Sequence, residues 1–144
     1  MIYIDTSCLL KLFRTEPSSV DVRAAIAADT QVIVSVLTEL ETLVQLKATW
    51  TGGSITRPQW RKLETELALL RNQPPFEFRT LVAAVFQTAL RQHRNSGNAH
   101  CRSLDRLHLA AMEELKVTRL TTHDEGQAKA AVGSSFEVVC PGRH

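Results

Sequence analysis

The feature that most constrains the fold of this chain is a regular alternation of short apolar runs with longer segments of helical periodicity. The apolar runs are rich in β-branched residues and predict buried strands at 2–5, 31–35, 117–122 and 136–140. Residues 76–81 fit either a short edge strand or an extended lead-in. Helices are expected over 7–13, 18–28, 36–50, 58–73, 82–94, 103–116 and 124–132.

Strands that alternate with helices along a chain are joined by crossovers, which produce a mainly parallel sheet covered by helices on both faces. We therefore expect a three-layer α/β/α sandwich. A chain of 144 residues is long enough for one such domain, and neither a linker nor an internal repeat interrupts it. A single domain over residues 1–144 is the resulting prediction.

Local signals mark several helix ends. Thr56 is a predicted cap with Pro58 in the first turn, and the two prolines at 74 and 75 end that helix. Ser103 is expected to cap the helix that follows it. Two apolar stripes recur at helical spacing, one made of Leu37, Leu40, Val44 and Ala48 and the other of Trp60, Leu63, Leu67 and Leu70. The second stripe is expected in the core.

Composition excludes several classes of protein. Hydrophobic residues make up 44% of the chain and charged residues 22%, as in an ordinary globular protein. No apolar run approaches the roughly 18 residues of a membrane span, so we expect a cytoplasmic protein without membrane contact. Cys8, Cys101 and Cys140 are odd in number and lack a C-x-x-C spacing, which disfavours disulfides and zinc knuckles. The net charge of +2 is too small to argue for nucleic acid alone.

Four acidic residues are predicted to converge on one edge of the sheet. Asp5 and Asp124 follow predicted strands, and the carboxyl ends of parallel strands share one edge where ligands bind. Asp105 lies in the first turn of its helix, and Glu41 lies about two turns into the helix after 31–35. Like charges about 4 Å apart repel by roughly 4 kcal/mol at an effective dielectric of 20, so such a cluster needs a cation. Oxygen ligands at an open site favour Mg²⁺ or Mn²⁺.

Each acid also has an ordinary structural interpretation. Asp124 could cap a helix with Gln127 completing a capping box, and Asp105 could simply favour the positive end of a helix. Periodicity alone does not choose between Glu39 and Glu41. Asp5 is the least ordinary, because an acid that ends a buried strand is costly unless it is paired.

The segments "YIDTS", "VSVLTELETL", "CRSLDRLHLAA" and "LTTHDEGQAKAA" resemble, in order and spacing, the four acidic motifs of the PIN-domain ribonucleases. The best match is to the VapC-like toxins of type II toxin-antitoxin pairs, and the resemblance spans essentially the whole chain. The pattern S-x-x-T-x-x-E falls on Ser35, Thr38 and Glu41, so it selects Glu41 over Glu39. The segment from Trp50 to Phe78 is less diagnostic.

The resemblance implies an endoribonuclease that uses Mg²⁺ or Mn²⁺ and an activated water to cut RNA, leaving a 5′ phosphate and a 3′ hydroxyl. Asp5, Asp105 and Asp124 would hold the metal directly or through water, and Glu41 would be a ligand or orient the attacking water. Thr6, Ser7 and Thr122 are candidates for supporting these acids, for contacting phosphate, or for capping helices.

RNA contact is expected from the basic stretch 91–102 and its continuation, with Arg94, Arg102 and Arg106 as candidates. A solvated strip is the alternative interpretation. His108 is expected to pack within its helix. A zinc site made of His93, His100, Cys101 and His108 is disfavoured, because their spacing fits no usual zinc pattern.

The resemblance further implies a cognate antitoxin and a homodimer, with a share of the second apolar stripe exposed to receive the partner. Three alternatives stay open: a PIN-fold RNA-processing nuclease without a toxin role, a catalytically silent PIN-fold binding module, and a receiver-like signalling domain. The last is disfavoured because no lysine follows the final predicted strand. A nucleotide cofactor is disfavoured by the lack of G-x-G-x-x-G and of a phosphate-loop lysine motif.

Overall fold

The computed structural model describes residues 1–97 and 99–143, and within them the strands form one parallel sheet. Its order is β3-β2-β1-β4-β5, and every neighbouring pair is parallel. The strands are β1 (Ile2–Ile4), β2 (Val32–Ser35), β3 (Phe76–Arg79), β4 (Arg119–Thr121) and β5 (Glu137–Val139). The predicted parallel sheet is confirmed, and residues 76–79 form an edge strand.

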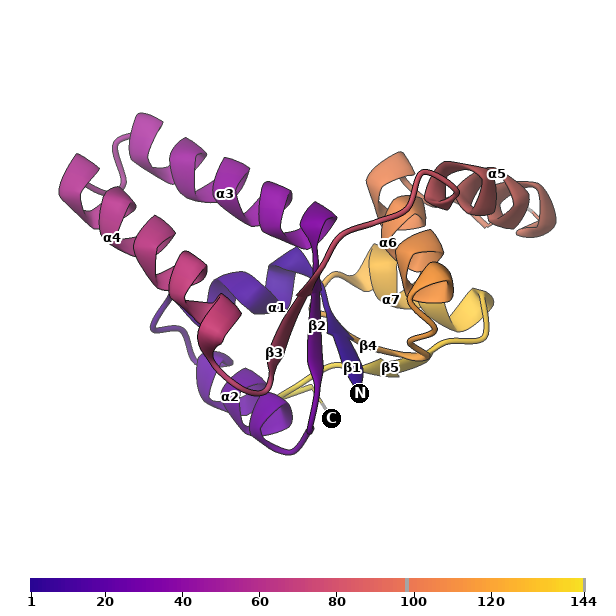
Figure 1. The fold of residues 1–144 in the computed structure, drawn as a ribbon, viewed down its shortest axis with the longest axis horizontal. Helices are drawn as coiled ribbons and strands as arrows, with labels where there is room; N and C mark the ends of the chain where they lie inside the picture. Colours follow the sequence, from indigo (N-terminus) through magenta and orange to yellow (C-terminus); the bar gives the residue numbers. More distant parts are fainter. Residues whose placement is uncertain (98, 144) are drawn as a thin grey trace.

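Helices cover both faces of the sheet (Figure 1). They are α1 (Thr6–Lys11), α2 (Ser19–Ala27), α3 (Val36–Thr51), α4 (Arg57–Leu69), α5 (Val85–Asn95), α6 (Ser103–Glu114) and α7 (Glu125–Gly133), with a short 3-10 turn η1 (Leu70–Asn72) after α4. The predicted three-layer sandwich is therefore confirmed.

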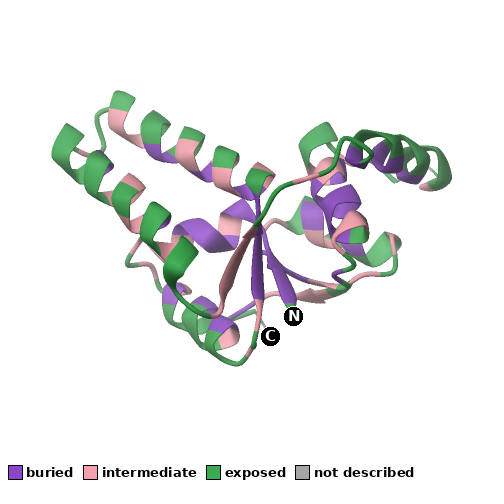
Figure 2. Ribbon diagram, in the orientation of Figure 1, coloured by how far each residue is buried: buried purple, intermediate pink, exposed green. Residues whose placement is uncertain are grey.

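Alternation along β1 explains the three layers, because successive strand residues point to opposite faces of a sheet. Ile2 and Ile4 pack with Leu9 of α1 and Val22 of α2. Tyr3 packs on the other side, with residues of α5, α6 and α7. Figure 2 shows the central strands buried and the outer surfaces of the helices exposed. In the part of the chain that the structure describes, no helix combines the length and the apolar character needed to cross a membrane.

The first predicted apolar stripe faces outward, in contrast to an ordinary amphipathic helix. Leu40 is 56% exposed and Val44 is 59% exposed, whereas Thr38 and Thr42 are fully buried on the opposite side of α3. Burial of these threonines is possible because their hydroxyls have partners: Thr38 donates to the carbonyl of Ile4 (3.1 Å) and Thr42 to the carbonyl of Thr38 (2.7 Å).

The second stripe belongs mainly to the core, as expected. Trp60 and Leu67 are buried, and the Trp60 ring stacks on Trp50 with centroids 4.2 Å apart. Thr56 caps α4 in a capping box with Gln59, which confirms the predicted start. The predicted cap at Ser103 is wrong. Ser103 is instead the first residue of α6, and the extended Arg102 before it is the N-cap, whose carbonyl accepts the amide of Arg106 (2.9 Å).

Candidate active site

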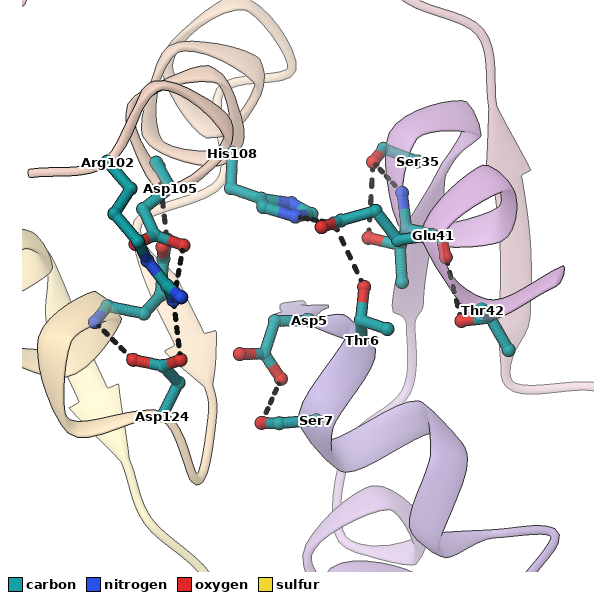
Figure 3. A network of polar contacts seen from close by, with 12 residues as sticks. Asp5, Thr6, Ser7, Ser35, Glu41, Thr42, Arg102, Asp105, His108 and Asp124 are labelled. Carbon is teal, nitrogen blue, oxygen red and sulfur yellow. Dashed lines mark hydrogen bonds and ion pairs between the residues drawn. The ribbon is translucent and has the colours of Figure 1, made fainter. Parts of the chain in front are cut away.

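All four predicted acids line one cavity of about 350 Å³ at the carboxyl edge of the sheet (Figure 3). Asp5 directly follows β1, and Asp124 lies three residues beyond β4. Helix α3 supplies Glu41, and the first turn of α6 supplies Asp105. The placement follows from the topology, because β2, β1 and β4 are parallel neighbours and end at the same edge.

Asp5 is a buried carboxylate, with 4% of its surface exposed. Its Oδ1 accepts the amide of Cys8 (3.0 Å), which makes it the N-cap of α1, and also the hydroxyl of Ser7 (2.7 Å). Its Oδ2 accepts the hydroxyl of Thr122. Burial raises the pKa of the Asp5 carboxyl above its ordinary value, and these hydrogen bonds offset only part of the rise. Asp5 forms no ion pair with any described residue.

The three predicted supporting hydroxyls bind the acids and do not cap helices. Ser7 and Thr122 both donate to Asp5, as described above. In addition, Thr122 Oγ1 accepts the amide of Asp124 (3.0 Å), so this one hydroxyl links two of the four acids. Thr6 donates to Oε1 of Glu41 (3.0 Å). The capping alternative for these residues is therefore wrong.

Glu41 and Glu39 lie on different sides of α3. Glu41 lines the cavity, whereas both oxygens of Glu39 bind the guanidinium of Arg71 in η1 (2.5 Å). Burial alone would raise the pKa of Glu41. The hydrogen bonds from His108 and from the hydroxyl of Thr6, together with the charge of Arg102, outweigh burial, so the pKa lies below its ordinary value.

His108 is the site residue whose role the sequence did not reveal. It is buried, as expected, but its Nε2 contacts Oε1 of Glu41, and its Nδ1 lies 2.7 Å from the hydroxyl of Tyr3. Its spacing of three residues from Asp105 was an available signal, because residues three apart lie on the same side of a helix. Tyr3 gave no such signal, since its place in an apolar run is typical of a core aromatic residue.

Arg102, predicted to contact RNA, bridges two of the acids. Its Nε lies 2.7 Å from Oδ2 of Asp105, and its Nη2 lies 2.8 Å from Oδ2 of Asp124. Asp124 also caps α7 by accepting the amide of Gln127 (2.9 Å). Burial opposes ionisation of Asp124, but that amide and the charge of Arg102 outweigh it, so the pKa lies below its ordinary value.

The other two arginine candidates lie outside this cavity. Arg94 is exposed near the end of α5. Arg106 is 6% exposed, and its Nη1 lies 3.3 Å from the hydroxyl of Ser134 at the end of α7. Of the three predicted RNA contacts, Arg102 alone lines the acidic cavity.

The donor set of the cavity is suited to a hard divalent cation, because four carboxylates and neighbouring hydroxyls supply oxygen ligands. Within residues 1–97 and 99–143, however, no three His, Cys, Asp or Glu side chains are arranged closely enough to hold a metal ion. The guanidinium of Arg102 already binds two of the carboxylates. A cation that binds Asp105 and Asp124 together would therefore compete with Arg102.

Replacing Arg102 by glutamine should strengthen Mn²⁺ binding by about two- to tenfold, the range expected for losing exposed ion pairs. The reason is that the metal would no longer displace a guanidinium from Asp105 and Asp124. Calorimetric titration with Mn²⁺ measures the change, and Arg94→Gln is the matched control because Arg94 lies outside the cavity. Unchanged or weaker Mn²⁺ binding by Arg102→Gln would show that Arg102 does not compete.

Comparison with known proteins identifies the family. The PIN domain profile matches residues 2–133. No curated protein matches the chain. The structure resembles VapC20 of Mycobacterium tuberculosis, described as a Sarcin-Ricin loop cleaving toxin, with a TM-score of 0.73, 15% identity, and coverage of 98% of this chain and 100% of that one.

Two further solved structures are similar. FitAcB from Neisseria gonorrhoeae gives a TM-score of 0.74 at 17% identity, with both chains covered in full. A toxin-antitoxin complex from Klebsiella pneumoniae gives 0.68 at 17% identity, again over the whole of both chains. At identities this low, the structural likeness shows a shared fold and no more. The profile match extends over most of the sequence. The chain therefore belongs to the PIN domain family.

Proposed function

We propose that this chain is a metal-dependent endoribonuclease that hydrolyses RNA phosphodiesters and acts as the toxin of a toxin-antitoxin pair. One observation carries the nuclease proposal: the acids of all four motifs line the same cavity at the carboxyl edge of the sheet. Family membership supports it, as does the likeness to a toxin that cleaves the Sarcin-Ricin loop.

The proposed chemistry divides between the metal and the side chains. Asp5, Asp105 and Asp124 are the proposed metal ligands, with Glu41 either a ligand or the group that orients the attacking water. A bound Mg²⁺ or Mn²⁺ would lower the pKa of water and neutralise charge that develops on the phosphate oxygens. Ser7 and Thr122 hold the Asp5 carboxylate in place, and Thr6 holds that of Glu41.

RNA binding is the second role that we propose for residues at the carboxyl edge of the sheet. Once released from Asp105 and Asp124, Arg102 could pair with a backbone phosphate beside the acids, because its side chain is 64% exposed. Arg94 stays a proposed outer contact. The buried position of Arg106 makes it the weakest of the three candidates.

The test is cleavage of a panel of structured RNAs by purified protein with Mg²⁺, with Mn²⁺ and with a chelator. We expect cleavage with either ion, none with chelator, and products that carry a 5′ phosphate and a 3′ hydroxyl. Cleavage that persists in chelator would contradict the metal assignment. Failure to cut any RNA with either ion would favour the alternative of a catalytically silent PIN-fold binding module.

The proposed partners are a cognate antitoxin and a second copy of the chain, with the single domain acting in the cytoplasm. Similar solved structures include a toxin-antitoxin complex, which supports the first partner. Apolar side chains that a monomer would leave in water support a protein interface, among them Leu40 and Val44 on α3 and Phe86 and Leu90 on α5. A PIN-fold RNA-processing nuclease without a toxin role is the alternative.

A further inference from the structure

A chain of hydrogen bonds runs from the start of α3 through the core to the cavity, and Figure 3 shows its last link, between His108 and Glu41. The amide of Thr38 donates to Oγ of Ser35 (3.2 Å), which lies 2.6 Å from the hydroxyl of Tyr3. That hydroxyl lies 2.7 Å from Nδ1 of His108, and Nε2 of His108 contacts Oε1 of Glu41. Tyr3, Ser35 and His108 are each at most 3% exposed. These groups therefore bond to one another and not to solvent.

A direction from Ser35 to Glu41 satisfies every donor and acceptor of this chain. The amide of Thr38 can only donate, so Ser35 accepts there, and in this direction it gives its own hydroxyl proton to Tyr3. Thr38 Oγ1 lies 3.1 Å from the carbonyl of Ile4 and 3.4 Å from the hydroxyl of Tyr3, so the carbonyl is its nearer acceptor. Tyr3 then accepts from Ser35 and donates its proton to Nδ1 of His108. At the other end, a carboxylate can only accept, so Nε2 of His108 carries the hydrogen. In this direction His108 is the neutral tautomer with hydrogen on Nε2.

Glu41 is anchored through one oxygen. Thr6 and His108 both donate to Oε1, and no hydrogen bond to Oε2 is found in the described part of the chain. The Glu41 side chain is 26% exposed, so fixing it costs rotamer entropy that a surface glutamate would normally retain. Two donors on Oε1 hold the side chain in one orientation at the wall of the cavity.

We propose that Tyr3 and His108 are positioning residues for Glu41, and that Tyr3 does this by selecting the Nε2–H tautomer of His108. Neither residue needs to touch RNA or metal. This inference rests on the proposed function, in which Glu41 binds the metal or orients the attacking water. The positioning of its side chain, however, is a property of the metal-free protein. Such outer partners fix the ligands of metal sites in the same way, through the hydrogen bond on the far nitrogen of an imidazole.

Three substitutions separate the steps. Tyr3→Phe removes the hydroxyl that selects the tautomer while keeping the buried ring. His108→Leu removes the donor to Glu41, and His108→Gln returns an N–H close to the position of Nε2. The matched control is Thr42→Val, which also deletes a fully buried hydroxyl on α3, one that bonds to the carbonyl of Thr38. Any general cost of losing a buried hydroxyl appears in that control.

Nitrogen-15 NMR of the metal-free protein reads the tautomer directly. We expect the Nε2–H form of His108 in the wild type and a mixture of tautomers in Tyr3→Phe. The carbon-13 resonance of the Glu41 carboxylate should broaden or move in Tyr3→Phe and His108→Leu, and stay in place in Thr42→Val. A wild-type ring with hydrogen on Nδ1, or with both nitrogens protonated, would overturn the proposal.

Mn²⁺ affinity and steady-state kinetics supply the functional measurement. His108→Leu should lose about 10- to 100-fold in Mn²⁺ affinity or in kcat, the usual cost of losing an outer partner of a metal ligand. Its KM for RNA should change little, and His108→Gln should recover most of the loss. A His108→Leu protein that matches Thr42→Val in all these measurements would refute the positioning role. If the wild type neither binds Mn²⁺ nor cleaves RNA, the proposed function fails, while the two NMR measurements still decide whether Glu41 is positioned.

Discussion

Replacing Asp5 by asparagine should abolish metal-dependent RNA cleavage while leaving the protein folded. We expect a loss of more than about 100-fold, beyond the usual cost of removing an outer partner of a metal ligand. The fold should survive because an asparagine can keep the hydrogen bonds of Asp5: its carbonyl can accept from Cys8 and Ser7, and its amide can donate to Thr122. Nuclease activity that is undiminished in Asp5→Asn would contradict the metal-site assignment.

The same substitution should stabilise the metal-free protein at neutral pH. Burial raises the pKa of Asp5, so the unfolded chain loses this proton at a lower pH than the folded chain. As pH rises above about 4, the unfolded state binds fewer protons than the folded state, and the free energy of unfolding falls until the folded carboxyl also ionises. Asp5→Asn removes that loss. Urea unfolding in chelator across pH measures it, with the exposed Asp21→Asn as control.

Expression of the wild-type chain without a partner should stop the growth of a bacterial host, whereas expression of Asp5→Asn should not. The acidic cavity is open to solvent, and uncontrolled cleavage of cellular RNA would block translation. RNA isolated after induction should show new cleavage sites in the wild-type culture alone. If growth continues while active enzyme accumulates, the toxin role fails and the RNA-processing alternative is favoured.

A small partner encoded beside this chain should restore growth in the same experiment. Arg102 demonstrates that a guanidinium fits between Asp105 and Asp124, so a basic side chain from a partner could bind there in its place. Inhibition of the purified enzyme should then weaken as Mn²⁺ is raised. Inhibition that is independent of Mn²⁺ would show that the partner acts elsewhere on the surface.

The architecture could be predicted because the spacing of apolar residues along a sequence reflects which side of each strand or helix is buried. The run at 31–35 reads as a buried strand whatever its neighbours are, and parallel strands then bring Asp5 and Asp124 to one edge. The orientation of α3 could not be predicted in the same way. Apolarity favours burial of Leu40 and Val44, yet Thr38 and Thr42 are buried because distant carbonyls and neighbouring turns satisfy their hydroxyls.

The contacts within the candidate site could not be predicted from sequence patterns either. The motifs indicated the four acids, but the partner of each acid depends on contacts that sequence spacing does not encode. Arg102 was expected to contact RNA, and in the structure it pairs with Asp105 and Asp124. His108 was expected to pack within its helix, and its buried ring also joins Glu41 to Tyr3, which lies 105 residues from His108 along the chain.

The central place of β1 in the sheet has a consequence for synthesis of the chain on the ribosome. Asp5 is made 117 residues before Thr122, whose hydroxyl holds its carboxylate. Strand β4 and helix α7 must therefore leave the ribosome before the cavity can close around Asp5, although the pairing of β1 with β2 is available much earlier. Until they emerge, the nascent chain lacks Asp124 and the hydroxyl of Thr122 at this edge of the sheet, so the cavity of four acids is incomplete.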